Sequence, residues 1–321
     1  MLGIEIGNFN IKLIETNKKG DFNRIKKNQR TPVNSIYNGK ISDVNSIADD
    51  IKNLLKKNNI KDKTICFTIS SSHNIIREIK LPKMKEEEIR TALSYEVEQY
   101  IPDISQYVYD YRFLGDSSDG DNFVRVMIAA SPKDIIYDYV KLSELLKLNI
   151  EAIDVYSNSL FKAFKKLVNL DGTVVIVDIG SNLTNLTVFE NKSFIFSRPI
   201  DFGGNEFTFK IVNELNIDFD KAEEYKLQKN ILLSDDEHIL NLKKEFENSL
   251  DNLIAELSRI FDFYSSLYHK AIEKVYLIGG TSKLFGIKEY LEAFFKIPII
   301  IPDNQEYIYF LPAYGCVLRG E

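Results

Sequence analysis

The sequence predicts an α/β fold built from two similar lobes, and three observations support this fold class. Strand-like and helix-like segments alternate along the 321 residues, which is the pattern of α/β units. A hairpin at residues 2–15 has a counterpart at residues 177–190. A strand at 274–280 ends in a Gly-Gly turn and is followed by a helix. A chain of this length has room for two lobes, each with its own core.

The order of elements follows from the spacing of apolar residues. Period-2 or continuous apolar runs bounded by turn residues predict strands, and apolar positions three and four apart predict helices. The helix at 84–101 is the clearest, because Ile89, Leu93, Val97 and Tyr100 share one face. The elements expected after the first hairpin are strands at 63–70 and 75–82, a helix at 84–101, strands at 107–114 and 123–130, a helix from Ser131, a strand at 150–155, a strand at 172–180, helical sequence over roughly 205–263, a strand at 274–280 and a helix at 284–295.

The composition is that of an ordinary globular protein. Apolar residues make up 44% of the chain and charged residues 27%, which are usual values. A net charge of −6 does not favour nucleic acid or an anionic membrane as a partner. Cys66 and Cys316 lie in separate apolar runs without metal-ligand spacing, so we expect buried free thiols. The N-terminus lacks the pattern of a signal peptide, and we expect a cytoplasmic protein.

The two hairpins have the same internal order of residues. Each has an acidic residue, Glu5 or Asp178, two positions before a glycine, Gly7 or Gly180, and small polar residues follow. Glycine lets backbone N–H groups approach an anion closely, and the carboxylates suit Mg²⁺ held through water. Two such turns on opposite lobes would clamp a phosphate. The alternative is two unrelated hairpins with ordinary turn residues.

A third motif, "LIGGTSK" at residues 277–283, adds a site for the rest of a nucleotide. Gly279 and Gly280 follow a buried strand, and ligands of α/β folds bind at the carboxyl ends of such strands. The small glycine residues would let a base or ribose lie against the backbone. We therefore expect a nucleotide rather than a free phosphate.

This order of motifs is that of the actin/Hsp70/sugar-kinase ATPase superfamily, and within it the chain resembles the PilM family of type IV pilus assembly proteins over nearly its whole length. The most specific stretches are "LPKMKEEEIRTALSYEVEQYIP", "VDIGSNLTNLTVFENKSFIFSRPIDFGGNEFT" and "IEKVYLIGGTSKLFGIKEYLEAFFKIPIIIPD". The division protein FtsA is similar as well, but FtsA-like chains usually end in a membrane-binding amphipathic helix. This chain ends "PAYGCVLRGE", which favours PilM.

The resemblance implies an actin-like bilobal ATPase fold with an FtsA-type subdomain 1C. Lobe I is expected at residues 1–155, with 1C inserted into subdomain 1A at about 82–152, and a connecting helix at 156–171 follows. Lobe II is expected at 172–310, with subdomain 2B at about 203–263, and residues 311–321 return to lobe I.

The resemblance also assigns ATP and Mg²⁺ as cofactors and assigns their binding residues. Glu5 and Asp178 would hold Mg²⁺ through water and would be catalytic together with Asp154. Glu223 and Lys226 match a family helix that reaches the ribose, although a plain amphipathic helix would look similar. The full set of implied nucleotide-binding residues is Gly7, Asn8, Asn10, Lys12, Gly180, Ser181, Asn182, Thr184, Gly203, Gly204, Glu223, Lys226, Gly279, Gly280, Thr281 and Lys283.

One residue departs from the family pattern. The first motif of the superfamily normally carries Asp, and this chain has Glu5. The extra methylene moves the carboxylate outward by about 1.5 Å, which matters for a group that positions Mg²⁺. We expect ATP binding with weak or conditional hydrolysis, because hydrolysis depends on positioning.

The expected partner is the N-terminal cytoplasmic peptide of the inner-membrane protein PilN, held in a groove between subdomains 1A and 1C. Through this partner the protein would be recruited to the inner face of the cytoplasmic membrane without inserting into it. The alternative for about half of the groove residues is that they form the core of 1C. The candidate groove residues are Leu81, Pro82, Met84, Ala92, Tyr95, Val97 and Tyr100.

Two other functions stay open at this point. One is an FtsA-like filament-forming division or cytoskeletal ATPase, and the other is a small-molecule kinase of the same superfamily. Homo-oligomers are compatible with each of these functions. Retention by a PilN peptide would favour the pilus adaptor, and phosphorylation of an added sugar would favour the kinase.

Overall fold

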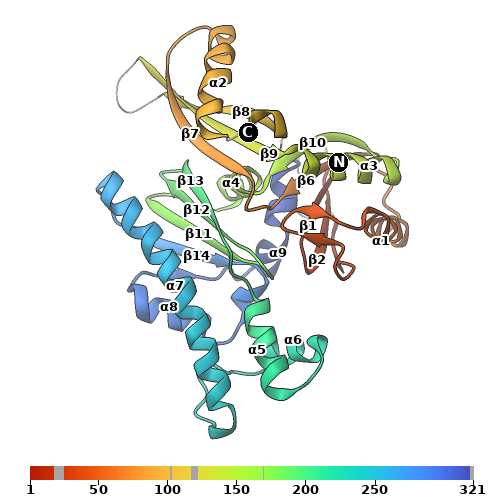
Figure 1. Cartoon of the computed structure of the whole chain (residues 1–321), viewed down its shortest axis with the longest axis vertical. Coiled ribbons are helices and arrows are strands. Elements are labelled where there is room, and N and C mark those ends of the chain that lie inside the picture. The colour runs from red at the N-terminus through yellow and green to blue at the C-terminus, as the bar shows by residue number, and fades with distance from the viewer. Residues whose placement is uncertain (18–24, 102, 117–121, 169, 319–321) are drawn as a thin grey trace. The chain divides into compact units, whose positions relative to one another are not determined.

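The computed structural model describes residues 1–17, 25–101, 103–116, 122–168 and 170–318. The chain separates into two compact units. Unit 1 comprises residues 1–169, 193–197 and 310–321, and unit 2 comprises residues 170–192 and 198–309. Both units contain a five-stranded sheet (Figure 1).

The large sheet of unit 1 has the strand order β10-β6-β1-β2-β3. β1 and β2 form the predicted antiparallel hairpin, and β6 and β10 continue the sheet in parallel with β1. A short hairpin of β4 (Ile36–Tyr37) and β5 (Lys40–Ile41) follows β3. The strands of the large sheet are β1 (Leu2–Ile6), β2 (Asn10–Glu15), β3 (Ile25–Arg30), β6 (Thr64–Ile69) and β10 (Asn149–Val155).

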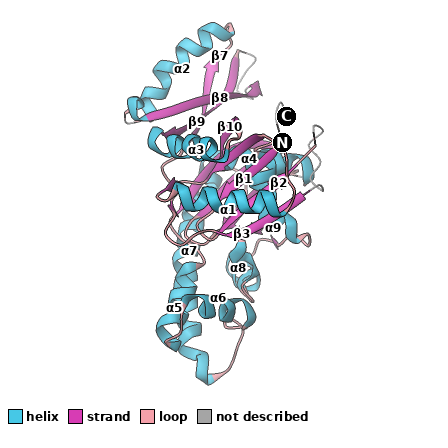
Figure 2. Cartoon of the chain, turned by 90° about the vertical axis from the view of Figure 1, so that its right-hand side faces the viewer, coloured by secondary structure: helices cyan, strands magenta, loops and turns pink. Residues whose placement is uncertain are grey.

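The two faces of this sheet differ because side chains alternate along each strand. Ile4 and Phe67 point to the face covered by α1 (Val44–Lys57) and α3 (Lys133–Leu146) and form a core with them. Figure 2 shows α1 lying across the strands. Glu5 therefore points to the opposite face, the side on which a Cβ at Gly3 would meet Ala313 and Val317. Helix α4 (Tyr156–Leu167) follows β10 of this sheet.

A second, three-stranded sheet in unit 1 has the order β7-β9-β8. α2 (Glu86–Tyr100) packs on it (Figure 1), and Leu93 and Val97 of this helix are buried in the shared core. The strands are β7 (Ile75–Pro82), β8 (Tyr107–Asp116) and β9 (Phe123–Pro132).

β10 does not belong to this small sheet, although the sequence placed it in the inserted subdomain. It pairs in parallel with β6 of the large sheet, and its Ile150 and Ile153 pack against the core that α3 completes. The local pattern of β10 is that of any half-buried strand, so it could not specify the sheet that the strand joins. The subdomain boundaries themselves stay a prediction.

The sheet of unit 2 repeats the arrangement of the large sheet in unit 1. Its order is β13-β12-β11-β14-β15, with an antiparallel β11–β12 hairpin and β14 parallel to β11. The predicted internal repeat is therefore structural, because both copies open an equivalent sheet. The strands are β11 (Thr173–Ile179), β12 (Thr184–Glu190), β13 (Ser193–Ile200), β14 (Lys274–Ile278) and β15 (Ile299–Ile300).

The region predicted as helical, roughly 205–263, is helical in the structure and is divided into separate helices. Asn216 takes a left-handed conformation that ends the first helix, and Asp218 caps the second. Left-handed residues and Asp caps are ordinary helix-end signals. The helices in and after this region are α5 (Asn205–Leu215), α6 (Phe219–Gln228), α7 (Leu240–Tyr268), α8 (Ile287–Phe295) and α9 (Gln305–Gly315).

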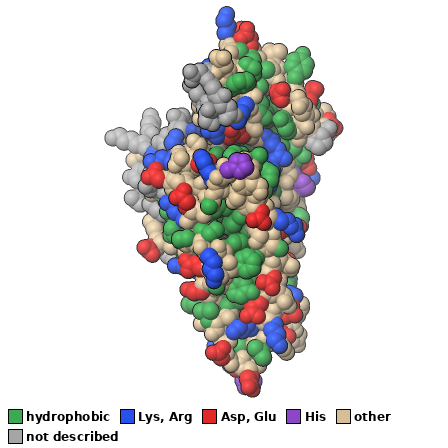
Figure 3. Space-filling view, turned by 90° about the vertical axis from the view of Figure 1, so that its left-hand side faces the viewer, with side chains coloured by type: hydrophobic (Ala, Val, Ile, Leu, Met, Phe, Trp, Pro, Cys, Tyr) green, Lys and Arg blue, Asp and Glu red, His purple; other side chains and the backbone are tan. Residues whose placement is uncertain are grey.

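The surface carries charges of both signs. On the face that Figure 3 presents, acidic and basic side chains are intermixed with apolar ones. Among the described residues, no helix combines the length and the apolar composition that crossing a membrane requires.

Candidate functional site

The first predicted phosphate loop connects β1 to β2 in unit 1. The Gly7 N–H donates to the Asn10 carbonyl (3.0 Å), and the Thr31 hydroxyl donates to the Gly7 carbonyl (2.7 Å). Gly7, Asn8 and Asn10 are partly exposed. The loop is thus held from within and by Thr31, the residue after β3, while its tip stays accessible.

Glu5 and Lys12 lie opposite each other on β1 and β2 and form an ion pair. The Lys12 Nζ is 2.7 Å from Glu5 Oε1, and both side chains are mostly buried. The sequence assigned Glu5 to Mg²⁺ and Lys12 to phosphate. A carboxylate is a ligand type that Mg²⁺ prefers, but the Lys12 ammonium already neutralises this one. Glu5 therefore fits Mg²⁺ only if Lys12 moves to another partner.

Asp154 lies in the same row of the sheet as Glu5, two strands away. Both residues are paired in register with Thr68 on β6, which puts their backbones about 10 Å apart. The Asp154 carboxylate receives Lys162 (2.8 Å), Asn158 (2.8 Å) and Ser159 (2.9 Å). These three donors favour a structural role. The catalytic role stays a prediction.

The second predicted phosphate loop, between β11 and β12 in unit 2, has the same closure as the first. The Gly180 N–H donates to the Leu183 carbonyl (3.0 Å), as Gly7 does to Asn10. Ser181 and Asn182 are partly exposed. Thr184 is buried, and its hydroxyl donates to the Phe202 carbonyl (2.8 Å). Thr184 therefore supports the loop and does not present a group to a ligand.

The Gly203–Gly204 turn packs directly against this loop. The Gly204 N–H donates to the Gly180 carbonyl (2.9 Å), and the Asn205 N–H donates to the Ser181 carbonyl (2.8 Å). A Cβ on Gly203 would overlap the Ser181 carbonyl. Only glycine allows the two backbones to lie this close.

Lys226 joins helix α6 to the same turn. Its buried ammonium donates to the Gly204 carbonyl (3.1 Å), to the Thr208 hydroxyl (2.8 Å) and to Glu223 (2.6 Å). Thr208 also donates to Glu223 (2.6 Å). The predicted ribose pair, Glu223 and Lys226, is therefore adjacent to the second phosphate loop but is already paired within the protein.

The Gly-Gly turn after β14 completes this cluster. Gly279 has a φ of +87°, and a Cβ there would overlap the Asp178 carboxylate. The Thr281 hydroxyl donates to the Gly180 carbonyl (3.1 Å). Gly280 has open space around the position of a Cβ. Lys283 lies apart from the cluster, 4.6 Å from the centre of the Tyr309 ring.

The structure thus brings together four separate segments of unit 2, as the sequence predicted. We call this cluster the glycine junction; its members are Asp178, Gly180, Ser181, Asn182, Gly203, Gly204, Glu223, Lys226, Gly279, Gly280 and Thr281. In the described part of the chain, no three His, Cys, Asp or Glu side chains are grouped as metal ligands. The Asp178 carboxylate lies at the junction and suits Mg²⁺ held through water.

Two residues that contact the glycine junction were not predicted from the sequence. Asn205 donates its side-chain amide to Asn182, and Thr208 bridges Lys226 and Glu223. Asn205 directly follows Gly203 and Gly204 in the sequence, and this position could have been used to predict that it lies at the junction. No sequence pattern indicated Thr208, because Glu223 and Lys226, which it contacts, lie on another helix.

The predicted partner groove is only partly at the surface. Leu81 and Val97 are 4% and 1% exposed and belong to the core between α2 and the small sheet. They therefore cannot line a groove, and the alternative reading as core residues is correct for them. Tyr95 (69%), Tyr100 (40%) and Pro82 are exposed, and Met84 and Ala92 are partly exposed.

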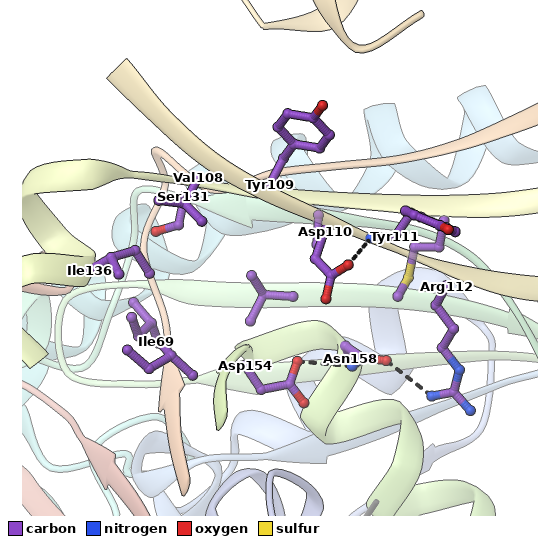
Figure 4. A pocket seen from close by; sticks show the side chains of 14 residues that line it. Ile69, Val108, Tyr109, Asp110, Tyr111, Arg112, Ser131, Ile136, Asp154 and Asn158 are labelled. Atoms are coloured by element: carbon purple, nitrogen blue, oxygen red, sulfur yellow. Dashed lines mark hydrogen bonds between the residues drawn. The ribbon is translucent and has the colours of Figure 1, made fainter. Parts of the chain in front are cut away.

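A pocket of about 180 Å³ lies elsewhere in unit 1, between the small sheet and the large one (Figure 4). Ile69, Ile136 and Ile153 form an apolar wall. Ser131 contributes a buried hydroxyl that has no hydrogen-bond partner. The other lining residues are Val108, Tyr109, Asp110, Tyr111, Arg112, Met127, Ala129, Asp154, Val155 and Asn158.

One end of the pocket is charged. Arg112 donates to Asn158 (3.3 Å), and Asn158 donates to Asp154 (2.8 Å), as the dashed lines in Figure 4 show. Burial lowers the pKa of the Arg112 guanidinium from its ordinary value, and the charge of Asp154 acts in the opposite direction. No local sequence pattern marks the residues of this pocket, because they come from six separate elements.

Known proteins are similar to this chain over most of its length. The sequence matches the family model described as type IV pilus assembly protein PilM over residues 3–311. Cell division protein FtsA of Staphylococcus epidermidis is 22% identical, over 91% of this chain and 71% of FtsA.

Solved structures give the fold. A chain of a PilM-PilN type IV pilus biogenesis complex superposes with a TM-score of 0.83 at 23% identity, covering 98% of this chain and 95% of that one. MreB5 of Spiroplasma citri bound to AMPPNP has a TM-score of 0.55 at 14% identity, with 98% and 93% covered. The fold is the actin-like ATPase fold, as predicted.

Proposed function

Because the chain belongs to the PilM family of type IV pilus assembly proteins, we propose that it is a cytoplasmic adaptor that binds the N-terminal segment of a PilN-type membrane protein. The observation that carries this proposal is the pocket of unit 1. We propose that this pocket, rather than the candidate groove residues of β7 and α2, forms the groove in which the segment binds. Recruitment to the inner face of the cytoplasmic membrane follows from such a partner.

The lining of the pocket suits an extended peptide. Isoleucine side chains on one wall favour burial of an apolar side chain, and the hydroxyl of Ser131 and the charged end near Arg112 offer polar contacts. Such a mixture of side-chain pockets and polar groups is how extended peptides are recognised. The small volume, about 180 Å³, admits one or two side chains rather than a folded domain.

A peptide titration tests this proposal. A fluorescein-labelled peptide with the N-terminal sequence of the PilN homologue from the same organism is titrated with the full chain, and fluorescence polarisation is measured. Ala129→Trp fills the pocket and should weaken binding at least tenfold. Phe123→Trp places the same side chain on the same strand outside the pocket and should leave binding unchanged. Equal affinity of both variants and the wild type would contradict the proposal.

We further propose that the glycine junction binds ATP. Support comes from the convergence of the β11–β12 loop, the Gly203–Gly204 turn, the buried Lys226 and the Gly279–Gly280 turn within unit 2, since closely spaced backbone N–H groups make an anion-binding concavity. MreB5, which shares the fold, was solved with AMPPNP. Asp178 would face Mg²⁺ through water, and the base would lie beside Gly280. For the first loop, in unit 1, we propose phosphate as the ligand, with Glu5, Asn8, Asn10 and Lys12 as the residues that would act on it.

Gly280→Val tests the nucleotide proposal without disturbing the fold. The structure has open space where the Cβ would stand, so the side chain should be tolerated and should occupy the place proposed for the base. We expect loss of binding of a fluorescent ATP analogue, at least twentyfold, with an unchanged thermal midpoint. Unchanged affinity in this variant would contradict the proposed position of the nucleotide.

A further inference from the structure

β8 is an edge strand. In the described part of the chain it pairs with β9 alone, because the order of the small sheet is β7-β9-β8. The other side of an edge strand presents backbone N–H and C=O groups that no ladder satisfies.

The pocket of unit 1 opens onto this edge. From β9 it takes alternate residues, Met127, Ala129 and Ser131, as expected when one face of a strand forms the floor. From β8 it takes the five consecutive residues 108–112. Consecutive side chains of a strand point to opposite faces of the sheet, so one face alone could contribute only every second residue to a cavity. Five consecutive residues line the pocket because it reaches the free edge of β8, where residues of both faces are accessible. Figure 4 shows Tyr109 and Asp110 on opposite sides of the strand.

The hydrogen bond of Tyr111 shows which backbone groups face outward. Its N–H donates to the carboxylate of the preceding residue, Asp110 (2.8 Å), and so does not point toward β9. In an antiparallel pair the outward groups belong to every second residue. The N–H and C=O groups of Tyr109 and Tyr111 therefore both point away from β9, on the side of the pocket.

Asp110 protects this edge. Its side chain is exposed, and its carboxylate covers the Tyr111 N–H. Charged side chains are a common means of keeping an edge strand from pairing with other chains. A carboxylate on an exposed side chain can rotate into water and be replaced by a carbonyl group, so the protection is reversible.

We propose that the partner segment binds as an added β-strand on β8, pairing with the backbone of Tyr109 and Tyr111 and displacing the Asp110 carboxylate. Every second side chain of the segment then points into the pocket, from the same face of the small sheet as Met127 and Ala129. This inference rests on the proposed function, since the occupant is the N-terminal segment of the PilN-type protein. It adds that backbone hydrogen bonds hold the segment, so that affinity depends on the outward N–H of Tyr111.

A proline exchange tests the backbone contact. Tyr111→Pro removes the outward N–H, and the ladder to β9 does not use that group, which is the position where an edge strand tolerates proline. Tyr111→Ala removes the ring and keeps the N–H. We expect the labelled peptide to bind at least tenfold more weakly to Tyr111→Pro and within threefold of wild type to Tyr111→Ala. Circular dichroism and the thermal midpoint report whether the proline variant is folded.

A series of modified peptides tests the same backbone hydrogen bonds without altering the protein. Each backbone N–H of the PilN-type peptide is methylated in turn, and the affinity of each peptide for the wild-type chain is measured. Strand addition predicts that methylation at every second position of the bound stretch weakens binding at least tenfold and that the positions between are tolerated. A loss without alternation overturns the inference while leaving the proposed function intact. Failure of the unmodified peptide to bind overturns both.

Discussion

Glu5 and Lys12 determine what the first phosphate loop can do. The two side chains neutralise each other at 2.7 Å within unit 1. If the loop binds phosphate and Mg²⁺ as proposed, a phosphate would compete with Glu5 for the Lys12 ammonium, and Mg²⁺ would compete with Lys12 for the Glu5 carboxylate. The ion pair would thus oppose the arrangement that hydrolysis needs, and weak or conditional turnover stays a prediction.

The substitution Glu5→Asp tests whether the Glu5–Lys12 ion pair limits ATP hydrolysis. The shorter side chain draws the carboxylate back from Lys12 and restores the acid that the superfamily normally carries. We expect Mg²⁺-dependent phosphate release to rise about tenfold, equivalent to about 1.4 kcal/mol in the activation barrier. Affinity for the ATP analogue should change less than threefold. A wild-type rate equal to that of Glu5→Asp would show that Glu5 does not limit hydrolysis.

Helix α6 is fixed to the glycine junction by Lys226. The ammonium is buried and has three acceptors, so removing it leaves the Glu223 carboxylate without its main counter-ion. Loss of one partner of a buried pair destabilises a protein by about 3–5 kcal/mol.

We therefore expect Lys226→Met to lower the free energy of unfolding of the unit that contains it by about 3 kcal/mol, measured by urea denaturation. Lys221→Met is the matched control, because Lys221 is on the same helix and pairs with Asp218 at the surface. Its urea midpoint should stay at the wild-type value. Equal midpoints for Lys226→Met and Lys221→Met would contradict the role given to Lys226.

Helix α1 depends on the N-cap residue Asp43 in a way that pH can reveal. The hydroxyl and the N–H of Ser46 both donate to its carboxylate and hold the pKa of Asp43 below its ordinary value. A lowered pKa in the folded state means that the stabilisation is complete above the unfolded pKa of about 4. It is lost as the pH falls through the folded value.

Asp43→Asn keeps an acceptor at the cap and does not titrate. The thermal midpoint of the wild type should therefore fall relative to that of Asp43→Asn as the pH is lowered from 5 to 2.5. Above pH 5 the difference between the two proteins should be constant. A constant difference down to pH 2.5 would mean that the cap does not contribute to acid sensitivity.

The elements that sequence alone could predict are those defined by local pattern. The hairpins containing Glu5 and Asp178, the strand before Gly279 and helix α2 were all expected at or near their observed positions, because each has its own periodicity or turn residues. The glycine junction was predictable as well, since glycine pairs mark the close approach of backbones.

What the sequence could not predict depends on contacts between distant segments. Ser131 and Arg112 have no local signal for a pocket, and β10 has no local signal for the sheet it joins. Leu81 and Val97 were assigned to a groove although an amphipathic helix buries the same residues in its own core. The division of residues 205–263 into three helices depends on Asn216, whose left-handed conformation is common for asparagine but not compulsory.

In the proposed function the peptide pocket and the glycine junction belong to different units. The peptide pocket and the edge of β8 are built from unit 1, and the glycine junction is built from unit 2. Each half can thus be disabled by a single substitution, Ala129→Trp or Gly280→Val, while the other half keeps its own residues. Independent loss of peptide or nucleotide binding in these variants would separate the two tasks.

Site-specific photo-crosslinking in cells tests the central proposal most directly. The photoreactive residue p-benzoylphenylalanine replaces either Val108, at the pocket and the β8 edge, or Tyr95, on the exposed face of α2. Both side chains are exposed, at 44% and 69%, so neither exchange should disturb the core. We predict a crosslink to the PilN-type protein from position 108 and none from position 95. A crosslink from position 95 alone would contradict the proposed binding pocket.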